Sequence, residues 1–375
     1  MAVLKEKLGK FPAVALVGPR QAGKTTLAKE LGGVYFDLEQ EEGRVALEFQ
    51  WHELMRGEKL VVLDEAQEYP DLFKRLRGAI DEDRKKMGRF LLLGSVSPGL
   101  MQFVSESLAG RMALVELTPF LWAELAAEQQ KNLWLYGGYP DGGVLQPEDY
   151  PDWQIHYLDL LTARDLPNWG LAAQPKLTQR LLKMLAVLNG QTFNGSQIGR
   201  SLDLSYKTVS SYLDYLEGAF LIRRLPPYHA NLKKRLIKSP KIYWRDSGLL
   251  HALMNIHSRE ELYHQPWAGV GWEGFVIEQV IGHLRLAGKN FEAYYLRTSD
   301  QYEVDLIVDF GKSRWAIEVK LTAAARLADL ERLEKTADMI QADKRILISR
   351  TEQCQSSETS VSCNLPYLLD RIDTE

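Results

Sequence analysis

The chain has 375 residues, of which 45% are hydrophobic and 26% charged, and its formal net charge at pH 7 is −4. This length allows two or three domains with cores of their own, and the composition is that of an ordinary soluble protein. The slightly acidic balance excludes a uniformly basic nucleic-acid binder, so any such function has to depend on local charge.

The sequence contains no sign of secretion or of membrane insertion. Its apolar runs have the length of buried strands, and the N-terminus lacks the apolar region of a signal peptide. Cys354 and Cys363 lie close together without further ligands at zinc spacing. We therefore expect a cytoplasmic protein without a membrane segment, whose thiols are reduced.

The first informative stretch is VALVGPRQAGKTTLAKELG, in which an apolar strand at 13–17 leads through a glycine-rich loop into a helix. The loop has the G-x-x-x-x-G-K-[ST] pattern, with the correct flanks on both sides. Glycine permits backbone conformations in which successive N–H groups face an anion, and the helix N-terminus adds partial positive charge. We therefore predict a nucleotide site formed by Gly18, Pro19, Arg20, Gln21, Ala22, Gly23, Lys24, Thr25 and Thr26.

Two of these residues have specific roles in such a loop. Lys24 is expected to reach the β- and γ-phosphates, and the Thr25 hydroxyl to coordinate Mg²⁺. The alternative is a glycine-rich turn that binds nothing.

The stretch GEKLVVLDEAQ predicts a second buried strand, which ends in Asp64 and Glu65. Ligands bind at the carboxyl edge of open α/β sheets, where both carboxylates are expected to lie. Asp64 would hold Mg²⁺, and Glu65 would act as the general base toward water. Acidic residues are common at strand ends, so this interpretation depends on the glycine-rich loop.

Two further candidates follow the third predicted strand, RFLLLGS. Ser95 is expected to contact the γ-phosphate or the attacking water, unless it merely belongs to the following turn. Arg111, in SLAGRM, is either an arginine finger, acting in cis or from a neighbouring subunit, or a surface charge. The sequence has no N-K-x-D motif that would read guanine, which favours ATP over GTP.

The motifs GPRQAGKTT, VVLDEAQ, LLLGS, SLAGR and GGYP follow one another in this order. Over about residues 13–322 the sequence resembles a group of bacterial and archaeal AAA-type ATPases that carry a C-terminal domain of unknown function related to PD-(D/E)XK nucleases. The resemblance implies an α/β fold with an AAA-type P-loop core on a parallel sheet (1–118) and a helical lid (119–175). A winged helix (176–228) and an α/β restriction-endonuclease-like domain with a tail (229–375) would follow.

The middle of the chain predicts helices. The aromatic residues of FLWAELAAEQQKNLWLYGGYP and the helix after it are interpreted as core, while Arg164 and Asp165 are candidates to face the nucleotide. Three helices follow from Lys176, and Ser205 is the expected N-cap of the last, which turns Leu213 and Leu216 inward.

This helix-turn-helix arrangement predicts either a DNA-binding or a protein-binding module. In the first case the last helix enters the major groove and its exposed polar face is formed by Lys207, Thr208, Ser210 and Ser211. Residues 218–245 favour DNA, because they include eight cations and no Asp or Glu: Arg223, Arg224, Lys233, Lys234, Arg235, Lys238, Lys241 and Arg245. Tyr228, Tyr243 and Trp244 are interspersed among them and suit stacking on bases.

The C-terminal part predicts an amphipathic helix with Glu273 near its start and three strands, FEAYYLRTS, QYEVDLIVDF and SRWAIEVKLT. Strand alternation puts Glu318 and Lys320 on one face, where Asp305 of the neighbouring strand can meet them. Another helix and the strand KRILIS come next, and the Ser-rich TEQCQSSETSVSC is expected to be a loop.

This pattern of carboxylates resembles the PD-(D/E)XK nuclease core, with EVD in place of the Pro-Asp element. The resemblance implies Mg²⁺ held by Asp305 and Glu318, with Lys320 assisting the attacking water and Glu273 completing the site. The alternative is an acidic hairpin in which Lys320 simply pairs with Glu318.

The sequence thus predicts an ATPase that uses ATP and Mg²⁺, acts on DNA and has the capacity to form a homo-oligomer. Two alternatives remain open. One is a nucleotide-driven regulatory protein whose C-terminal modules bind proteins, and the other is a DNA-binding ATPase with an inactive nuclease fold.

Overall fold

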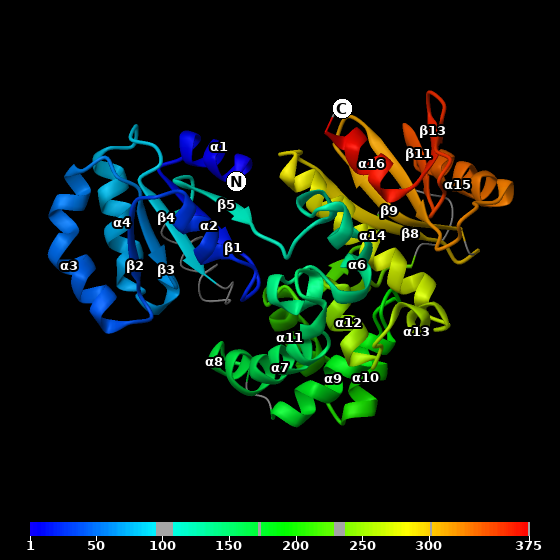
Figure 1. The fold of residues 1–375 in the computed structure, drawn as a ribbon, viewed down its shortest axis with the longest axis horizontal. Helices are drawn as coiled ribbons and strands as arrows, with labels where there is room; N and C mark the ends of the chain where they lie inside the picture. Colours follow the sequence, from blue (N-terminus) through cyan, green and yellow to red (C-terminus); the bar gives the residue numbers. More distant parts are fainter. Residues whose placement is uncertain (95–107, 172–173, 229–236, 301, 374–375) are drawn as a thin grey trace. The chain divides into compact units, whose positions relative to one another are not determined.

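The chain folds into two compact units in a computed structural model that describes all residues except 95–107, 172–173, 229–236, 301 and 374–375 (Figure 1). The first unit comprises residues 1–119, 165–171 and 214–220, and the second comprises residues 120–164, 172–213 and 221–375. Within the described residues, no helix has the length and apolarity needed to cross a membrane.

The first unit is built on a five-stranded parallel sheet with the order β2-β3-β4-β1-β5. Its strands are β1 (Ala13–Val17), β2 (Val34–Asp37), β3 (Val61–Asp64), β4 (Phe90–Gly94) and β5 (Met112–Glu116). The helices α1 (Ala2–Lys10), α2 (Lys24–Glu30), α3 (Glu41–Arg56) and α4 (Asp71–Glu82) connect or precede them. The expected α/β core with a parallel sheet is therefore present.

The central strands of this sheet are apolar along their length because both faces are covered. Every residue of β1, β3 and β4 is buried. Helix α4 covers part of the sheet with an apolar stripe that includes Leu72, Leu76 and Ile80. Since the strands are parallel, the ends of β1, β3 and β4 meet at one edge of the sheet.

The second unit begins with a helical and aromatic region. It contains α6 (Ala127–Tyr136), α7 (Asp152–Leu160) and α12 (Ser247–Leu253), together with short turns at Trp122–Glu124, Pro140–Val144, Pro147–Asp149 and Leu161–Asp165. Trp134, Tyr139 and Tyr157 are buried, which confirms the interpretation of these aromatic residues as core. The short α8 (Leu166–Asn168) belongs to the first unit.

Three helices and an antiparallel pair of strands follow one another along the chain. They are α9 (Pro175–Val187), α10 (Gly195–Leu202), α11 (Tyr206–Gly218), β6 (Ile222–Leu225) and β7 (Lys241–Trp244). The Ser205 hydroxyl accepts a hydrogen bond from the Thr208 amide at 3.1 Å, so the expected N-cap is confirmed. Leu213 and Leu216 are completely buried, as expected.

The C-terminal part forms a six-stranded mixed sheet with the order β12-β13-β11-β10-β9-β8 (Figure 1). Its strands are β8 (Glu292–Arg297), β9 (Glu303–Asp309), β10 (Arg314–Val319), β11 (Lys344–Ile348), β12 (Gln355–Ser356) and β13 (Ser360–Cys363). The accompanying helices are α13 (Arg259–Tyr263), α14 (Ala268–Leu286), α15 (Leu327–Met339) and α16 (Leu365–Ile372).

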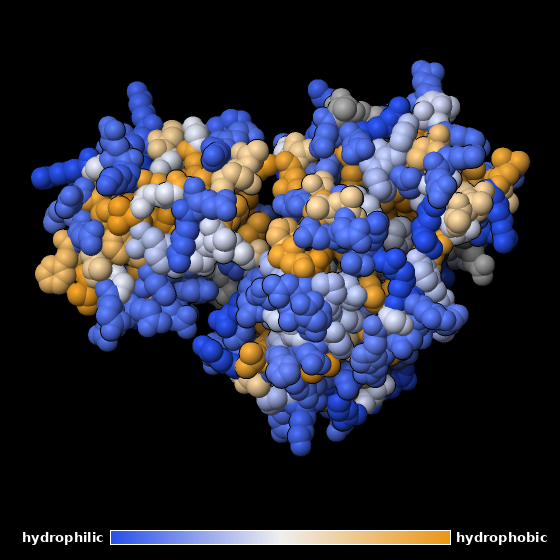
Figure 2. All heavy atoms as spheres, viewed as in Figure 1, coloured by the Kyte–Doolittle hydropathy of each residue, from blue (hydrophilic) through white to orange (hydrophobic). Residues whose placement is uncertain are grey.

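Two expectations for this part were wrong. Helix α14 is not amphipathic, because it is buried without interruption from Gly274 to Leu284 and packs on all sides. The Ser-rich segment is not a loop, since it forms β12 and β13 at the edge of the sheet. Serine is tolerated there because edge strands are half exposed, and Figure 2 shows many hydrophilic side chains across the visible surface.

Candidate functional site

The glycine-rich loop lies at the carboxyl end of β1, and its backbone requires glycine at two positions. A Cβ on Gly18 would collide with the carbonyl oxygen of Leu117, which lies directly after β5. Gly23 has a φ of +94°, in the left-handed region, and caps α2. The sequence pattern is therefore needed to form this loop and the helix behind it.

Lys24 lies inside the loop, with only 7% of its surface exposed. Its ammonium donates hydrogen bonds to the carbonyl oxygens of Gly18 at 3.0 Å and Pro19 at 2.7 Å. Burial lowers the pKa of Lys24 to about 8, although the nearby Glu65 and Asp64 carboxylates oppose this shift. A concentrated positive charge is thus held where an anion would meet the loop.

Asp64 ends β3 and is almost completely buried. Its Oδ2 accepts hydrogen bonds from the Thr25 hydroxyl at 2.7 Å and from the Tyr35 hydroxyl at 2.6 Å. The structure therefore brings together the two predicted magnesium ligands, Thr25 and Asp64. Burial and the hydrogen bond to Asp64 raise the pKa of Tyr35, so Tyr35 remains a donor.

Glu65 has the backbone conformation of a strained site. Its φ of +48° and ψ of 48° are left-handed, which is unusual for a residue with a side chain and is typical of functional positions. The side-chain amide of Gln67 donates to Glu65 Oε2. Burial raises the pKa of Glu65, against the opposing effects of Gln67 and Lys24, and makes this carboxylate a better proton acceptor near neutral pH.

These residues fit a nucleoside triphosphate with Mg²⁺. The loop supplies turned backbone and a buried ammonium, and Thr25 and Asp64 supply the hard oxygen ligands that Mg²⁺ prefers. Glu65 follows Asp64 directly and interacts electrostatically with Lys24. Of the predicted loop residues, Ala22 is buried, whereas Gln21 and Thr26 are exposed.

Arg20 connects the loop to a second segment of the same unit. Its Nη1 donates to Asp165 Oδ1 at 2.6 Å, and its guanidinium carbon lies 5.8 Å from the centre of the Trp169 ring. Asp165 is buried, whereas the neighbouring Arg164 is exposed. Of the two residues considered to face the nucleotide, the structure therefore places Asp165 against the loop.

The two remaining candidates are Ser95 and Arg111. Ser95 lies outside the described residues. Arg111 directly precedes β5, which runs parallel to β1 and pairs Met112 with Ala13, so Arg111 lies at the opposite edge of the sheet. Its guanidinium pairs with Asp81 at 2.8 and 3.0 Å. The pairing with Asp81 is that of the surface-charge alternative, and the role of Arg111 as an arginine finger stays a prediction.

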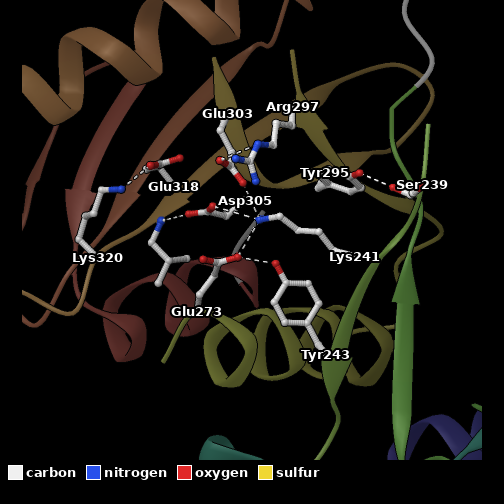
Figure 3. A network of polar contacts seen from close by, with 11 residues as sticks. Ser239, Lys241, Tyr243, Glu273, Tyr295, Arg297, Glu303, Asp305, Glu318 and Lys320 are labelled. Atoms are coloured by element: carbon white, nitrogen blue, oxygen red, sulfur yellow. Dashed lines mark hydrogen bonds and ion pairs between the residues drawn. The ribbon is translucent and has the colours of Figure 1, made fainter. Parts of the chain in front are cut away.

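A second group of functional candidates lies in the C-terminal sheet (Figure 3). Helix α14 supplies Glu273, β9 supplies Glu303 and Asp305, and β10 supplies Glu318. Asp305 and Glu318 are buried, and burial raises the pKa of both, with the neighbouring carboxylates acting in the same direction. The predicted meeting of Glu273, Asp305 and Glu318 is therefore present.

Lys241 of β7 lies among these carboxylates. Its Nζ is 3.0 Å from Glu273 Oε1, 2.8 Å from Glu303 Oε1 and 3.8 Å from Asp305 Oδ1. Burial alone would lower the pKa of Lys241, but the surrounding acids, Glu273 first, raise it well above its usual value. The Tyr243 hydroxyl also donates to Glu273.

Within the same group, Glu318 is paired with Lys320. Lys320 Nζ lies 2.5 Å from Glu318 Oε1, and the Val319 amide donates to Asp305 Oδ2 at 2.9 Å. Glu318 Oε2 is buried and has no hydrogen-bond partner among the described residues. The pairing of Lys320 with Glu318 is the arrangement expected for a structural hairpin.

The Mg²⁺ implied by the nuclease resemblance does not fit this arrangement. Lys241 occupies the space between three of the carboxylates, and Lys320 engages the fourth. Over the described part of the chain, no three His, Cys, Asp or Glu side chains are placed to hold a metal ion together. A pocket of about 480 Å³ opens onto the group and is also lined by Asn189, Arg297 and Arg332.

Several described side chains of the basic segment are turned inward and do not contribute to an exposed surface of cations and aromatic rings. Arg223 and Arg245 both pair with the buried carboxylate of Glu278 on α14. Tyr243 and Trp244 are buried in the core. Together with Lys241, these side chains face inward because their strands pack against α14. Lys233, Lys234 and Arg235 lie outside the described residues.

Several residues of both sites had no specific role in the sequence interpretation. Tyr35 and Gln67 contact the two predicted catalytic carboxylates, and no local pattern marks either of them. Glu303 lies two residues before Asp305 on the same strand, and alternation could have placed both on one face. Lys241 had been assigned to a basic surface, and only its tertiary position reveals its carboxylate partners.

The chain matches three families in succession. Residues 10–126 match an AAA domain, residues 127–260 match a domain of unknown function (DUF8612), and residues 268–368 match a second domain of unknown function (DUF4143). The residues of the glycine-rich loop, Asp64 and Glu65 all lie within the AAA match.

Two mycobacterial proteins are similar over most of the chain. They are the uncharacterized protein Mb2031c of Mycobacterium bovis and the uncharacterized protein Rv2008c of Mycobacterium tuberculosis. Each is 39% identical over 332 residues, which cover 87% of this chain and 74% of the mycobacterial protein.

Two solved structures have a weak likeness. The Aeropyrum pernix ORC2 protein in its ADP form has a TM-score of 0.29 and 17% identity, over 60% of this chain and 83% of that chain. A variant of Thermotoga maritima RUVB has a TM-score of 0.28 and 19% identity, over 60% of this chain and 88% of that chain.

Proposed function

We propose that this chain binds ATP with Mg²⁺ and hydrolyses it. The chain belongs to the same family as the mycobacterial protein Rv2008c and matches an AAA domain at residues 10–126. The observation that carries this proposal is the 2.7 Å contact between the Thr25 hydroxyl and Asp64 beside the buried ammonium of Lys24. A glycine-rich turn without a ligand would not need this combination.

Each residue has a defined part in the proposed reaction. Bound Mg²⁺–ATP supplies the phosphoryl group and a cation that polarises it. Lys24, which is bonded to the carbonyl oxygens of Gly18 and Pro19, would contact the phosphates, and Thr25 and Asp64 would hold the cation. Glu65, kept in place by Gln67, orients the attacking water and accepts its proton.

Substitution of the proposed base tests this function. In Glu65→Gln the side chain keeps its shape but loses the ability to accept a proton, so ATP binding persists and turnover falls by about 100-fold or more. The exposed Glu68 lies three residues further on, and Glu68→Gln is the matched control. Normal turnover in Glu65→Gln would remove this residue from the role of base.

We propose DNA as the partner of this ATPase. The support is the order of three helices and an antiparallel strand pair at α9–β7, which suits a winged helix, and the exposure of Lys207 and Ser211 on α11. The internal pairing of Arg223, Lys241 and Arg245 weakens the electrostatic part of this argument. A protein-binding module is therefore the competing interpretation.

ATP turnover measured with and without DNA distinguishes a DNA partner from a protein partner. Single-stranded, duplex and branched DNA are added to protein of known oligomeric mass, and Lys207→Ala is compared with Lys176→Ala on α9. If DNA is the partner, at least one of these DNAs raises the turnover, and Lys207→Ala weakens the effect. Unchanged turnover with all three DNAs would favour protein partners.

A further inference from the structure

The group of carboxylates in the C-terminal part contains its own cation. Lys241 comes from β7, whereas Glu273 comes from α14 and Glu303 and Asp305 come from β9 (Figure 3). Lys241 is only 2% exposed and Asp305 only 5% exposed. Charges this deeply buried persist only when they are paired, so Lys241 and the carboxylates depend on one another.

The space around Lys241 suits an ammonium group. An ammonium has three donors, and three carboxylate oxygens lie 2.8 to 3.8 Å from Nζ. The rings of Tyr295 and Tyr243 lie 5.5 and 5.8 Å from the same nitrogen, and aromatic rings attract organic cations. Lys241 thus has partners on several sides.

The carboxylate oxygens are largely used already. Asp305 Oδ2 accepts from the Val319 amide, Glu273 Oε1 accepts from Tyr243 as well as from Lys241, and Glu318 Oε1 accepts from Lys320. Glu318 Oε2 has no hydrogen-bond partner among the described residues. A divalent ion placed there against Asp305 would stand close to the ammonium groups of Lys241 and Lys320 and would be repelled by both.

We propose that Lys241 is the resident cation of this carboxylate group, that it keeps divalent metal ions out, and that the C-terminal domain therefore does not cleave DNA by a metal-dependent route. The group instead serves as an ionic connection between β7 and the C-terminal sheet. The backbone of Lys241 also forms an isolated antiparallel β-bridge with Thr192. The same residue therefore connects the helix-turn-helix region to α14 and β9.

Metal binding to the nucleotide-free full-length chain tests this proposal directly. Calorimetric titration with Mn²⁺ is carried out on the wild type, on Lys241→Met and on Lys238→Met, a control in which an exposed lysine of the same segment is replaced. Asp305→Asn, alone and combined with Lys241→Met, identifies binding at the carboxylate group and separates it from binding near Asp64.

Lys241→Met is expected to gain a saturable Mn²⁺ site that Asp305→Asn removes, while the wild type and Lys238→Met have no such site in the millimolar range. The proposal is overturned if the wild type binds Mn²⁺ at a site that Asp305→Asn abolishes. A folded Lys241→Met without a new site also overturns it, because Lys241 would then not be what excludes the metal.

Loss of Lys241 leaves several carboxylates unpaired, and circular dichroism shows whether the variant folds. Should Lys241→Met fail to fold, the wild type and Asp305→Asn decide the question: identical Mn²⁺ isotherms support the proposal, and a site missing from Asp305→Asn contradicts it. ATP binding depends on Lys24 and not on these residues, so a failure here leaves the proposed ATPase function untouched.

Discussion

At the scale of single residues, the proposed nucleotide site depends on a few polar contacts that orient the glycine-rich loop and the two carboxylates. Asp64 accepts hydrogen bonds from the hydroxyls of Thr25 and Tyr35, and Glu65 accepts one from the side-chain amide of Gln67. The motif residues were predictable because they are contiguous in the chain and their chemistry is local. The roles of Tyr35 and Gln67 were not predictable, since many residue types could occupy those positions without changing the local sequence pattern.

The contact between Arg20 and Asp165 leads to a prediction about affinity. A buried carboxylate holds the Arg20 guanidinium, which would otherwise be available to an anion at the loop. In Asp165→Asn the charge disappears while the shape remains, so ATP is expected to bind about fivefold more tightly, a gain of about 1 kcal/mol. Fluorescence titration with a labelled nucleotide measures this change.

The control for this prediction is Asp159→Asn, which replaces an exposed carboxylate on α7. Weaker ATP binding in Asp165→Asn would mean that Asp165 orders the loop, and that it does not compete with phosphate for Arg20.

At the scale of elements, the sequence was sufficient where periodicity and capping are local. The start of α11 at Ser205 and the strands β8, β9 and β10 were predicted in this way. Helix α14 was misjudged because its burial on all sides comes from neighbours distant in sequence. The short strands β12 and β13 were missed because serine has no preference for strands, and only pairing with β11 creates them.

Helix α12 carries a buried histidine whose titration should be visible in the stability of the protein. His251 Nδ1 donates to the Leu135 carbonyl at 3.0 Å, in the tautomer that this contact requires, and Nε2 is buried without a partner among the described residues. Burial lowers the pKa of His251 to about 4 from 6.5, and the hydrogen bond to Leu135 only partly opposes this shift. The folded protein therefore holds this imidazole neutral.

The free energy of unfolding should decrease as the pH falls from about 6.5 to about 4, because His251 is protonated in the unfolded chain over this range but stays neutral in the folded protein. This residue contributes about 3 kcal/mol to that decrease. Burial raises the pKa of the neighbouring Asp246 to about 6, which has the opposite effect in the same pH range. Urea unfolding of wild type and His251→Phe between pH 7 and pH 4 isolates the histidine, and parallel pH profiles would contradict this assignment.

At the scale of the whole molecule, the two units differ in how far their chemistry could be predicted. The first unit places the glycine-rich loop, Asp64 and Glu65 at one sheet edge, as a parallel sheet requires. In the second unit the expected carboxylates meet, but the cation among them is Lys241, which lies about 30 residues before Glu273 along the chain. Charge pairing across such a distance has no signature in sequence, and Lys241 was therefore assigned to an open basic surface.

The most direct test of the account is a calorimetric titration of the full chain with Mg²⁺–ATP, beside Lys24→Ala and the control Lys59→Ala, in which an exposed lysine is removed. The account predicts saturable binding to the wild type and to Lys59→Ala. It predicts a loss of binding in Lys24→Ala by about 100-fold or more, because the buried ammonium is the proposed main contact to the phosphates. Absence of heat with the wild type, or equal affinity in folded Lys24→Ala, would contradict the assignment of the loop as the nucleotide site.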